Sequence, residues 1–178
     1  MEKKLLKQFD ALEIQRTRLL QRLCLSPSQI LNERSGPHTW SPNQVIHHLI
    51  MAEELSYKSI KAKVLTGNFE KAGSMSYLRE LLLKLFLRSN IKFKAPVAVR
   101  TIPEGIAIEE LTLRWNNSRM QLKELLESLP ESLLDKYIFK HPVAGKMNIY
   151  GGLDFLKEHV RRHEFQIKKL LAHGNEKL

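Results

Sequence analysis

The sequence predicts an all-α fold, a four-helix bundle in which a long crossover between the second and third helices carries an extra helix. Apolar residues recur at helical spacing over almost the whole chain of 178 residues, without internal repeats or strand–helix–strand alternation. Hydrophobic residues make up 43% of the chain, and eight glycines and seven prolines are too few for a many-turned β-sandwich. The length suits one domain, so residues 1–178 are expected to form a single bundle domain.

The first helix is predicted over residues 2–24. Its apolar face, which Arg16 interrupts, consists of Leu5, Phe9, Leu12, Leu19 and Leu23. This face is expected to pack into the core of the bundle.

The second helix begins at a strong N-terminal signal, Ser41-Pro42-Asn43-Gln44. Serine is a favoured cap, proline suits the first helical position, and glutamine three residues after the cap completes a capping box. The helix is expected to continue to about Thr66 and to stop at Gly67. Its inward face is predicted to consist of Val45, His48, Ala52, Leu55, Ser59 and Ala62.

The third and fourth long helices are predicted over residues 107–129 and 148–172. Their apolar residues alternate by three and four, which is typical of the narrow seam of a helix bundle. The third seam consists of Leu111, Trp115, Ser118, Leu122, Leu125 and Leu129. The fourth consists of Ile149, Leu153, Leu156, Val160, His163, Ile167 and Leu170.

The crossover spans residues 67–106. Residues 76–89 have the pattern of an extra helix, whereas two prolines and an alternating stretch at 97–100 predict extended or irregular chain in the second half. The most apolar stretch, residues 81–87, contains Lys84 and is far too short to span a bilayer, so no transmembrane segment is expected.

The N-terminal sequence and the single cysteine both favour a cytoplasmic protein. Residues 1–12 are charged and amphipathic, unlike a signal peptide. One cysteine, Cys24, allows no internal disulfide and no multi-cysteine metal site, and nothing nearby in the sequence would activate it as a nucleophile. The sequence contains no phosphate-binding loop, dinucleotide fingerprint or serine-nucleophile elbow.

Three histidines occupy inward positions, where a bundle normally places apolar side chains. His159 and His163 are four residues apart and therefore share one helix face, a spacing that lets two imidazoles bind one metal ion. The zinc-protease pattern H-E-x-x-H is absent, because valine follows His159. His48 can face this pair from the second helix. Periodicity alone leaves open that these histidines only pack and form hydrogen bonds in the core.

Three segments resemble the DinB/YfiT-like superfamily. Residues 40–49, WSPNQVIHHL, are similar to the second helix of that family. The segment HPVAG at residues 141–145 resembles the turn before its fourth helix, and HVRRHEFQI at residues 159–167 resembles the fourth helix itself. These segments follow in the family's order and at its separations.

The resemblance implies a divalent metal site whose ligands are His48, His159 and His163, with zinc or nickel the preferred ion. His47 lies about 100° from the inward face and is assigned to the surface or to a position behind the ligands. The family includes proteins similar to metal hydrolases and to transferases of low-molecular-weight thiols. A small-molecule substrate, such as a thiol, is therefore expected at the mouth of the bundle.

The sequence identifies no catalytic residue. Gln44 is placed to reach either a ligand histidine or the Ser41 cap. Glu53 and Glu54 are predicted to point away from the inward face, and Trp40 is predicted to anchor the entrance of the helix by packing. A non-catalytic metal-binding or ligand-binding module therefore remains an alternative to an enzyme.

Positive charge is concentrated in one segment of the chain. The net charge is +10, and residues 57–100 contain ten basic and two acidic residues, a net +8. Such a segment forms a solvated face, or binds phosphate groups or an anionic membrane surface. Charge alone gives only sequence-independent affinity for nucleic acid, so no specific nucleic-acid partner is expected. The apolar face around residues 78–87 would favour a homodimer.

Overall fold

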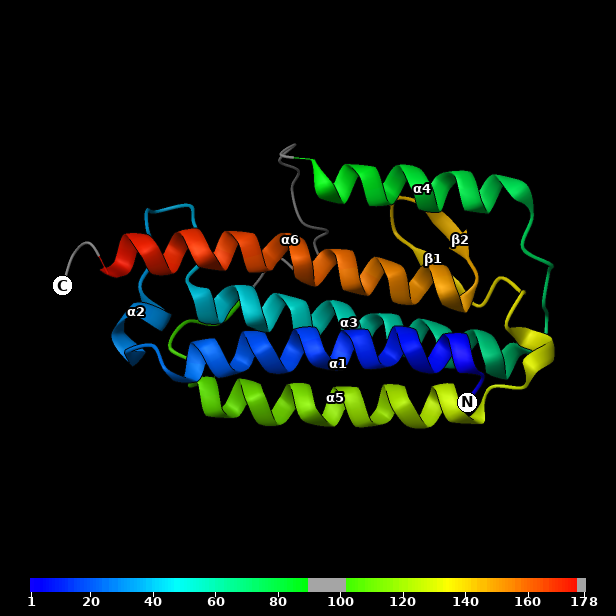
Figure 1. Ribbon diagram of the computed structural model, residues 1–178, viewed down its shortest axis with the longest axis horizontal. Coiled ribbons are helices and arrows are strands. Elements are labelled where there is room, and N and C mark those ends of the chain that lie inside the picture. The colour runs from blue at the N-terminus through cyan, green and yellow to red at the C-terminus, as the bar shows by residue number, and fades with distance from the viewer. Residues whose placement is uncertain (90–101, 176–178) are drawn as a thin grey trace.

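The computed structural model describes residues 1–89 and 102–175, and this part of the chain forms the predicted all-α bundle (Figure 1). Its four long helices are α1 (Lys3–Cys24), α3 (Pro42–Thr66), α5 (Ile108–Ser128) and α6 (Ile149–Asn175). Each contacts two others, in the cyclic order α1, α6, α3, α5. Every predicted long helix is confirmed, with boundaries within three residues of those expected.

The N-terminus of α3 has the capping box that the sequence predicts. The Ser41 hydroxyl accepts a hydrogen bond from the Gln44 amide at 3.2 Å, and the Gln44 side-chain oxygen accepts one from the Ser41 amide at 3.0 Å. At the other end, Gly67 adopts a φ of 67°, a left-handed conformation that glycine tolerates and that terminates the helix. The direction of α3, and with it the position of His48, is therefore fixed at both ends.

The extra helix of the crossover, α4 (Ser74–Arg88), packs along α6 on the outside of the bundle (Figure 1). At this contact the Glu80 carboxylate lies 2.5 Å from where a Cβ on Gly151 of α6 would stand. Residues 102–107 lead irregularly into α5, whereas the extended stretch expected at 97–100 lies outside the described residues. No helix in the described ranges is long and apolar enough to cross a membrane.

Several short elements were not predicted from the sequence. They are a helix, α2 (Ser28–Asn32), a 3₁₀ turn, η2 (Glu131–Leu133), and a hairpin of β1 (Phe139–His141) with β2 (Gly145–Met147). The hairpin reverses at residues 142–144, within the turn that the sequence predicted, and Gly145 has a positive φ of 81°. β1 contacts α3 and α6, which places His141 beside the bundle core.

The core consists of two apolar clusters, one toward each end of the bundle. One contains Leu156 of α6, and the other contains Val160, one turn further along the same helix. The predicted face of α1 is buried throughout, but on α3 the prediction is partly wrong, because Leu55 is 43% exposed whereas Glu53, Ser56 and Ile60 are buried. His159 lies between Leu156 and Val160 in the sequence, at the boundary between the two clusters.

Candidate metal centre

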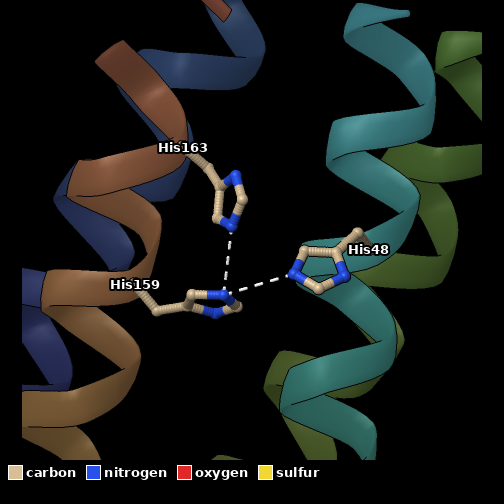
Figure 2. A group of neighbouring side chains, drawn as sticks. All are labelled: His48, His159 and His163. Atoms are coloured by element: carbon tan, nitrogen blue, oxygen red, sulfur yellow. Dashed lines mark hydrogen bonds between the residues drawn. The ribbon is translucent and has the colours of Figure 1, made fainter. Parts of the chain in front are cut away.

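Three histidine side chains from two helices meet in the interior of the bundle. His48 projects from α3, and His159 and His163 project from successive turns of α6 toward it (Figure 2). His48 is 4% exposed, and the other two are partly buried. The structure therefore brings together all three residues that the sequence singled out as metal ligands.

The separations between their nitrogen atoms suit a common ion. His159 Nε2 lies 3.2 Å from His48 Nε2 and 3.1 Å from His163 Nε2, and the donor atoms of all three residues lie within 4.8 Å of one another. Nitrogen ligands at about 2.0–2.1 Å from a tetrahedral zinc ion are about 3.3–3.4 Å apart. Two of the three separations already lie within about 0.3 Å of that value, and the third is at most 4.8 Å.

The hydrogen bond of one ligand fixes its tautomer. His163 Nδ1 lies 2.8 Å from Gln166 Oε1, and because an amide oxygen only accepts, Nδ1 must donate. His163 Nε2 then carries a lone pair directed at His159. His159 Nε2 can either donate or accept, so its contacts with His48 and His163 cannot both be separate hydrogen bonds. A cation would accept all three lone pairs.

Burial keeps the α6 histidines neutral. Desolvation, followed by the neighbouring His48, lowers the pKa of His163 to about 3. Desolvation together with His163 and His48 places the pKa of His159 well below its ordinary value of 6.5. Arg162 contributes to both shifts in the same direction. Neutral imidazole is the form that binds metal, so these residues need not release a proton near pH 7 before they coordinate an ion.

Aromatic rings support two of the three histidines. Trp40, predicted only as a packing anchor, lies with its ring centroid 4.9 Å from that of His48. Phe155, which the sequence analysis did not single out, stacks on His159 at 5.3 Å with 18° between the ring planes. The sequence signal that could have identified Phe155 is its position four residues before His159, which places both rings on the same helix face. These rings restrict the rotation of the two imidazoles and cover them with apolar surface.

A fourth histidine lies behind this aromatic layer. The His141 ring contacts the edge of Phe155, with centroids 4.4 Å apart. Its Nδ1 accepts hydrogen bonds from the backbone amides of Val143 and Ala144, at 3.2 and 3.0 Å. Burial lowers the pKa of His141 to about 4. Within the turn, this imidazole therefore acts as a neutral hydrogen-bond acceptor.

Two other polar residues of α3 are engaged elsewhere. The Gln44 side chain completes the capping box and donates to the Ile102 carbonyl at 3.3 Å, so the capping role is the one observed. His47 is 7% exposed, so of its two expected positions, the surface or behind the ligands, the surface position is wrong. Its Nε2 accepts a hydrogen bond from Arg114 at 2.8 Å, and Arg114 in turn pairs with both oxygens of Glu54. Neither side chain is a member of the histidine cluster.

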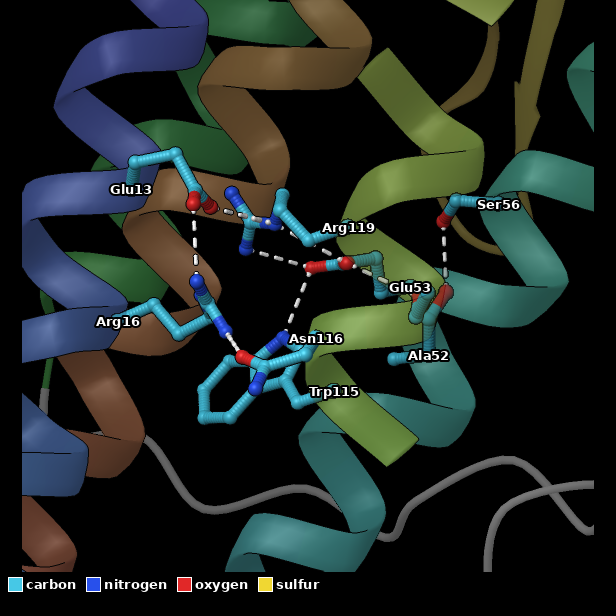
Figure 3. Close-up of polar contacts among 9 residues, drawn as sticks. Glu13, Arg16, Ala52, Glu53, Ser56, Trp115, Asn116 and Arg119 are labelled. Carbon is cyan, nitrogen blue, oxygen red and sulfur yellow. Dashed lines mark hydrogen bonds and ion pairs between the residues drawn. The ribbon is translucent and has the colours of Figure 1, made fainter. Parts of the chain in front are cut away.

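The prediction that Glu53 points away from the core is also wrong. Its side chain is 2% exposed and pairs with Arg119 of α5, which is buried to the same extent, at 2.7 Å (Figure 3). The carboxylate also accepts hydrogen bonds from the Trp115 indole at 3.1 Å and the Ser118 hydroxyl at 3.0 Å. Glu13 of α1 approaches Arg119 at 3.3 Å. These contacts join three helices and assign Glu53 to the framework of the bundle.

Removing one partner of the Glu53–Arg119 ion pair should lower the free energy of unfolding more than removing both charges. Arg119→Met leaves the Glu53 carboxylate buried without its cation, and we expect the free energy of unfolding to fall by about 3–5 kcal/mol. The double variant Glu53→Gln/Arg119→Met should lose less, because the glutamine oxygen still accepts from Trp115. Urea denaturation of the three proteins measures the difference. A double variant less stable than Arg119→Met would contradict this account.

The lowered pKa of His141 predicts a specific dependence of stability on pH. Its stabilising effect is complete above the ordinary pKa of 6.5 and is lost as the pH falls toward 4, because the unfolded chain binds the proton first. The full loss corresponds to about 3 kcal/mol. In chelator-treated protein at pH 5, His141→Asn should reduce the slope of unfolding free energy against pH by about 1.2 kcal/mol per pH unit. An equal slope in variant and parent would contradict the prediction. The exposed His173→Asn is the control.

Comparison with known proteins supports the resemblance seen in the sequence. The DinB superfamily profile matches residues 11–167, a range that includes all three clustered histidines. The chain is similar to the uncharacterized protein YuaE of Bacillus subtilis (strain 168), with 25% identity over 140 residues that cover 79% of this chain and 82% of that protein. No solved structure matches the chain. Since the family match covers most of its length, the chain belongs to the DinB superfamily.

Proposed function

We propose that this protein is a metal-dependent enzyme that binds one divalent cation, zinc or nickel, through His48, His159 and His163. The substrate would be a small electrophilic molecule, and the nucleophile would be water or a low-molecular-weight thiol. The observation that carries this proposal is the convergence of three imidazole nitrogens on one point between α3 and α6. The fold and the family match are compatible with it.

The composition of the cluster favours a catalytic site over a structural one. Structural zinc sites are usually closed by four protein ligands, whereas catalytic sites have three and an open position. Within the described ranges, no cysteine or carboxylate joins the three histidines, and Cys24 is exposed at the end of α1. Three neutral ligands would therefore leave at least one position for an exchangeable molecule.

A divalent cation bound in this way acts as a Lewis acid and lowers the pKa of a coordinated water or thiol. The residues of the chain would supply position and environment. The two helices hold the imidazoles in place, and Gln166 fixes the tautomer of His163. The Trp40 and Phe155 rings limit hydration around the site, which strengthens electrostatic interactions within it.

Metal binding should depend on the three clustered histidines and not on how many histidines the chain contains. We expect untagged protein to bind one zinc or nickel ion per chain, and His163→Ala to lose this binding, because two imidazoles remain where three converged. His173→Ala removes an exposed histidine from the same helix and is the matched control. Elemental analysis after metal loading and gel filtration gives the stoichiometry. Equal losses in both variants would reject the assignment of ligands.

A variant of Gln166 should weaken metal binding at this site without abolishing it. Gln166→Ala removes the acceptor of the His163 Nδ1 proton but leaves all three ligands in place. Loss of such an outer partner typically weakens metal affinity about 10–100-fold. Competition with a chromophoric chelator measures this change. An unaltered affinity would contradict the proposed control of the tautomer.

The open position can be tested with the cobalt-substituted protein. Azide and small thiols should each change its visible absorption, because an exchangeable ligand alters the ligand field of the ion. Transfer of a bound thiol to an electrophile, without hydrolysis of esters or amides, identifies a thiol transferase. Hydrolysis of esters or amides, without thiol transfer, identifies a hydrolase. A spectrum that no thiol or anion perturbs would mean a closed, non-catalytic metal site and would reject the enzymatic proposal.

A further inference from the structure

The outward face of α4 is apolar and uncovered. Of the sixteen exposed large apolar residues in the described chain, six lie between residues 75 and 85. They are Met75, Tyr77, Leu78, Leu81, Leu82 and Leu85, and their exposed fractions range from 49% to 56%. We call these six residues the α4 apolar face. Figure 1 shows α4 at the edge of the molecule, with α6 along one side.

The opposite side of α4 is already packed. Leu83 and Leu87 are buried in the bundle core, and Ser76 is fully buried. A surface helix normally has one apolar side and one polar side, and a helix that is apolar on both is usually covered on both. Contiguous exposed apolar surface of this kind marks an interaction site.

The helix is firmly attached to α6 and presents its apolar face from a fixed position. Arg88 donates two hydrogen bonds to the Glu158 carboxylate, at 2.8 and 2.6 Å. Arg162 of α6 donates to the Leu87 and Ser89 carbonyls at the C-terminal end of α4, at 3.2 and 2.8 Å. Glu80 lies against Gly151 on the inner side.

The charges around this face identify its partner. The basic residues of α4 are Arg79, Lys84 and Arg88, and its one acidic residue, Glu80, is on the inner side. The described residues 57–89 contain seven basic and two acidic residues, a net charge of +5. A second copy of the chain would bring like charges together across a two-fold axis, whereas an anionic lipid surface would neutralise them.

We propose that the α4 apolar face docks the protein on the surface of anionic phospholipid bilayers. The helix lies parallel to the bilayer, with its leucines inserted at the level of the headgroups and with Arg79 and Lys84 paired with lipid phosphates, since Arg88 is held by Glu158. Tyr77 suits this region, since aromatic residues with a polar tip concentrate at the membrane interface. This docking is independent of metal binding and of the proposed reaction.

Sedimentation with vesicles tests the proposal directly. The full chain should bind vesicles of equal parts phosphatidylglycerol and phosphatidylcholine, but not vesicles of phosphatidylcholine alone. Leu81→Gln/Leu82→Gln should weaken this binding at least about tenfold, because two inserted side chains become polar. The matched control is Leu113→Gln/Met120→Gln, which alters two residues of similar exposure on α5 and should bind as the parent does.

A second variant tests the contribution of the basic residues of α4 to vesicle binding. Arg79→Gln/Lys84→Gln should also weaken binding about tenfold and reduce its dependence on salt. Circular dichroism shows whether each variant retains its helices.

The proposal is overturned if the parent does not bind anionic vesicles, or if Leu81→Gln/Leu82→Gln and Leu113→Gln/Met120→Gln weaken binding equally. It is also overturned if lipid-free parent is a dimer that Leu81→Gln/Leu82→Gln converts to a monomer, because a second copy then covers the face.

Discussion

Three imidazole nitrogens directed at one point inside a helix bundle are the constraint on which the rest of this structure depends. Each neutral imidazole has one lone pair and one proton, so three Nε2 atoms cannot fully satisfy one another. Holding them together requires α3 and α6 to lie side by side at a fixed register. The capping box at Ser41 begins α3 at the required position, and Gly67 ends it.

Two buried polar groups in the same bundle differ in a way that distinguishes framework from function. The Glu53 carboxylate receives hydrogen bonds from Trp115, Ser118 and Arg119, and the charge of Arg119 balances its own. The protein itself therefore satisfies that group. The histidine cluster instead brings nitrogen atoms of three neutral side chains within 4.8 Å of one another, with no cysteine or carboxylate in the described part of the chain joining them. A buried ion pair balances its own charge, whereas three converging neutral imidazoles are the donor set of a metal site.

The sequence predicted the bundle and the histidine cluster because both follow from local regularities. Helix periodicity located the four long helices, and the spacing of His159 and His163 placed both on one face of α6. The proximity of His48 depended on the resemblance to the DinB family, since nothing local specifies which helix faces α6. The structure brings all three residues together.

What the sequence could not predict depends on residues far apart in the chain. Glu53 has the pattern of a surface carboxylate until Arg119, sixty-six residues later, is placed opposite it. His47 is buried for the same reason, because its partner Arg114 belongs to another helix. The hairpin before α6 consists of two three-residue strands, which are too short to show a periodic pattern. Helix periodicity, by contrast, is visible within a single segment.

The central claim is that His48, His159 and His163 form one metal site, and anomalous diffraction tests it most directly. Crystals of metal-loaded protein would be measured on both sides of the absorption edge of the added zinc or nickel. The account predicts one anomalous peak per chain, about 2.0–2.1 Å from the Nε2 atoms of all three histidines. The absence of a peak between α3 and α6, or a peak bound by other residues, would contradict it.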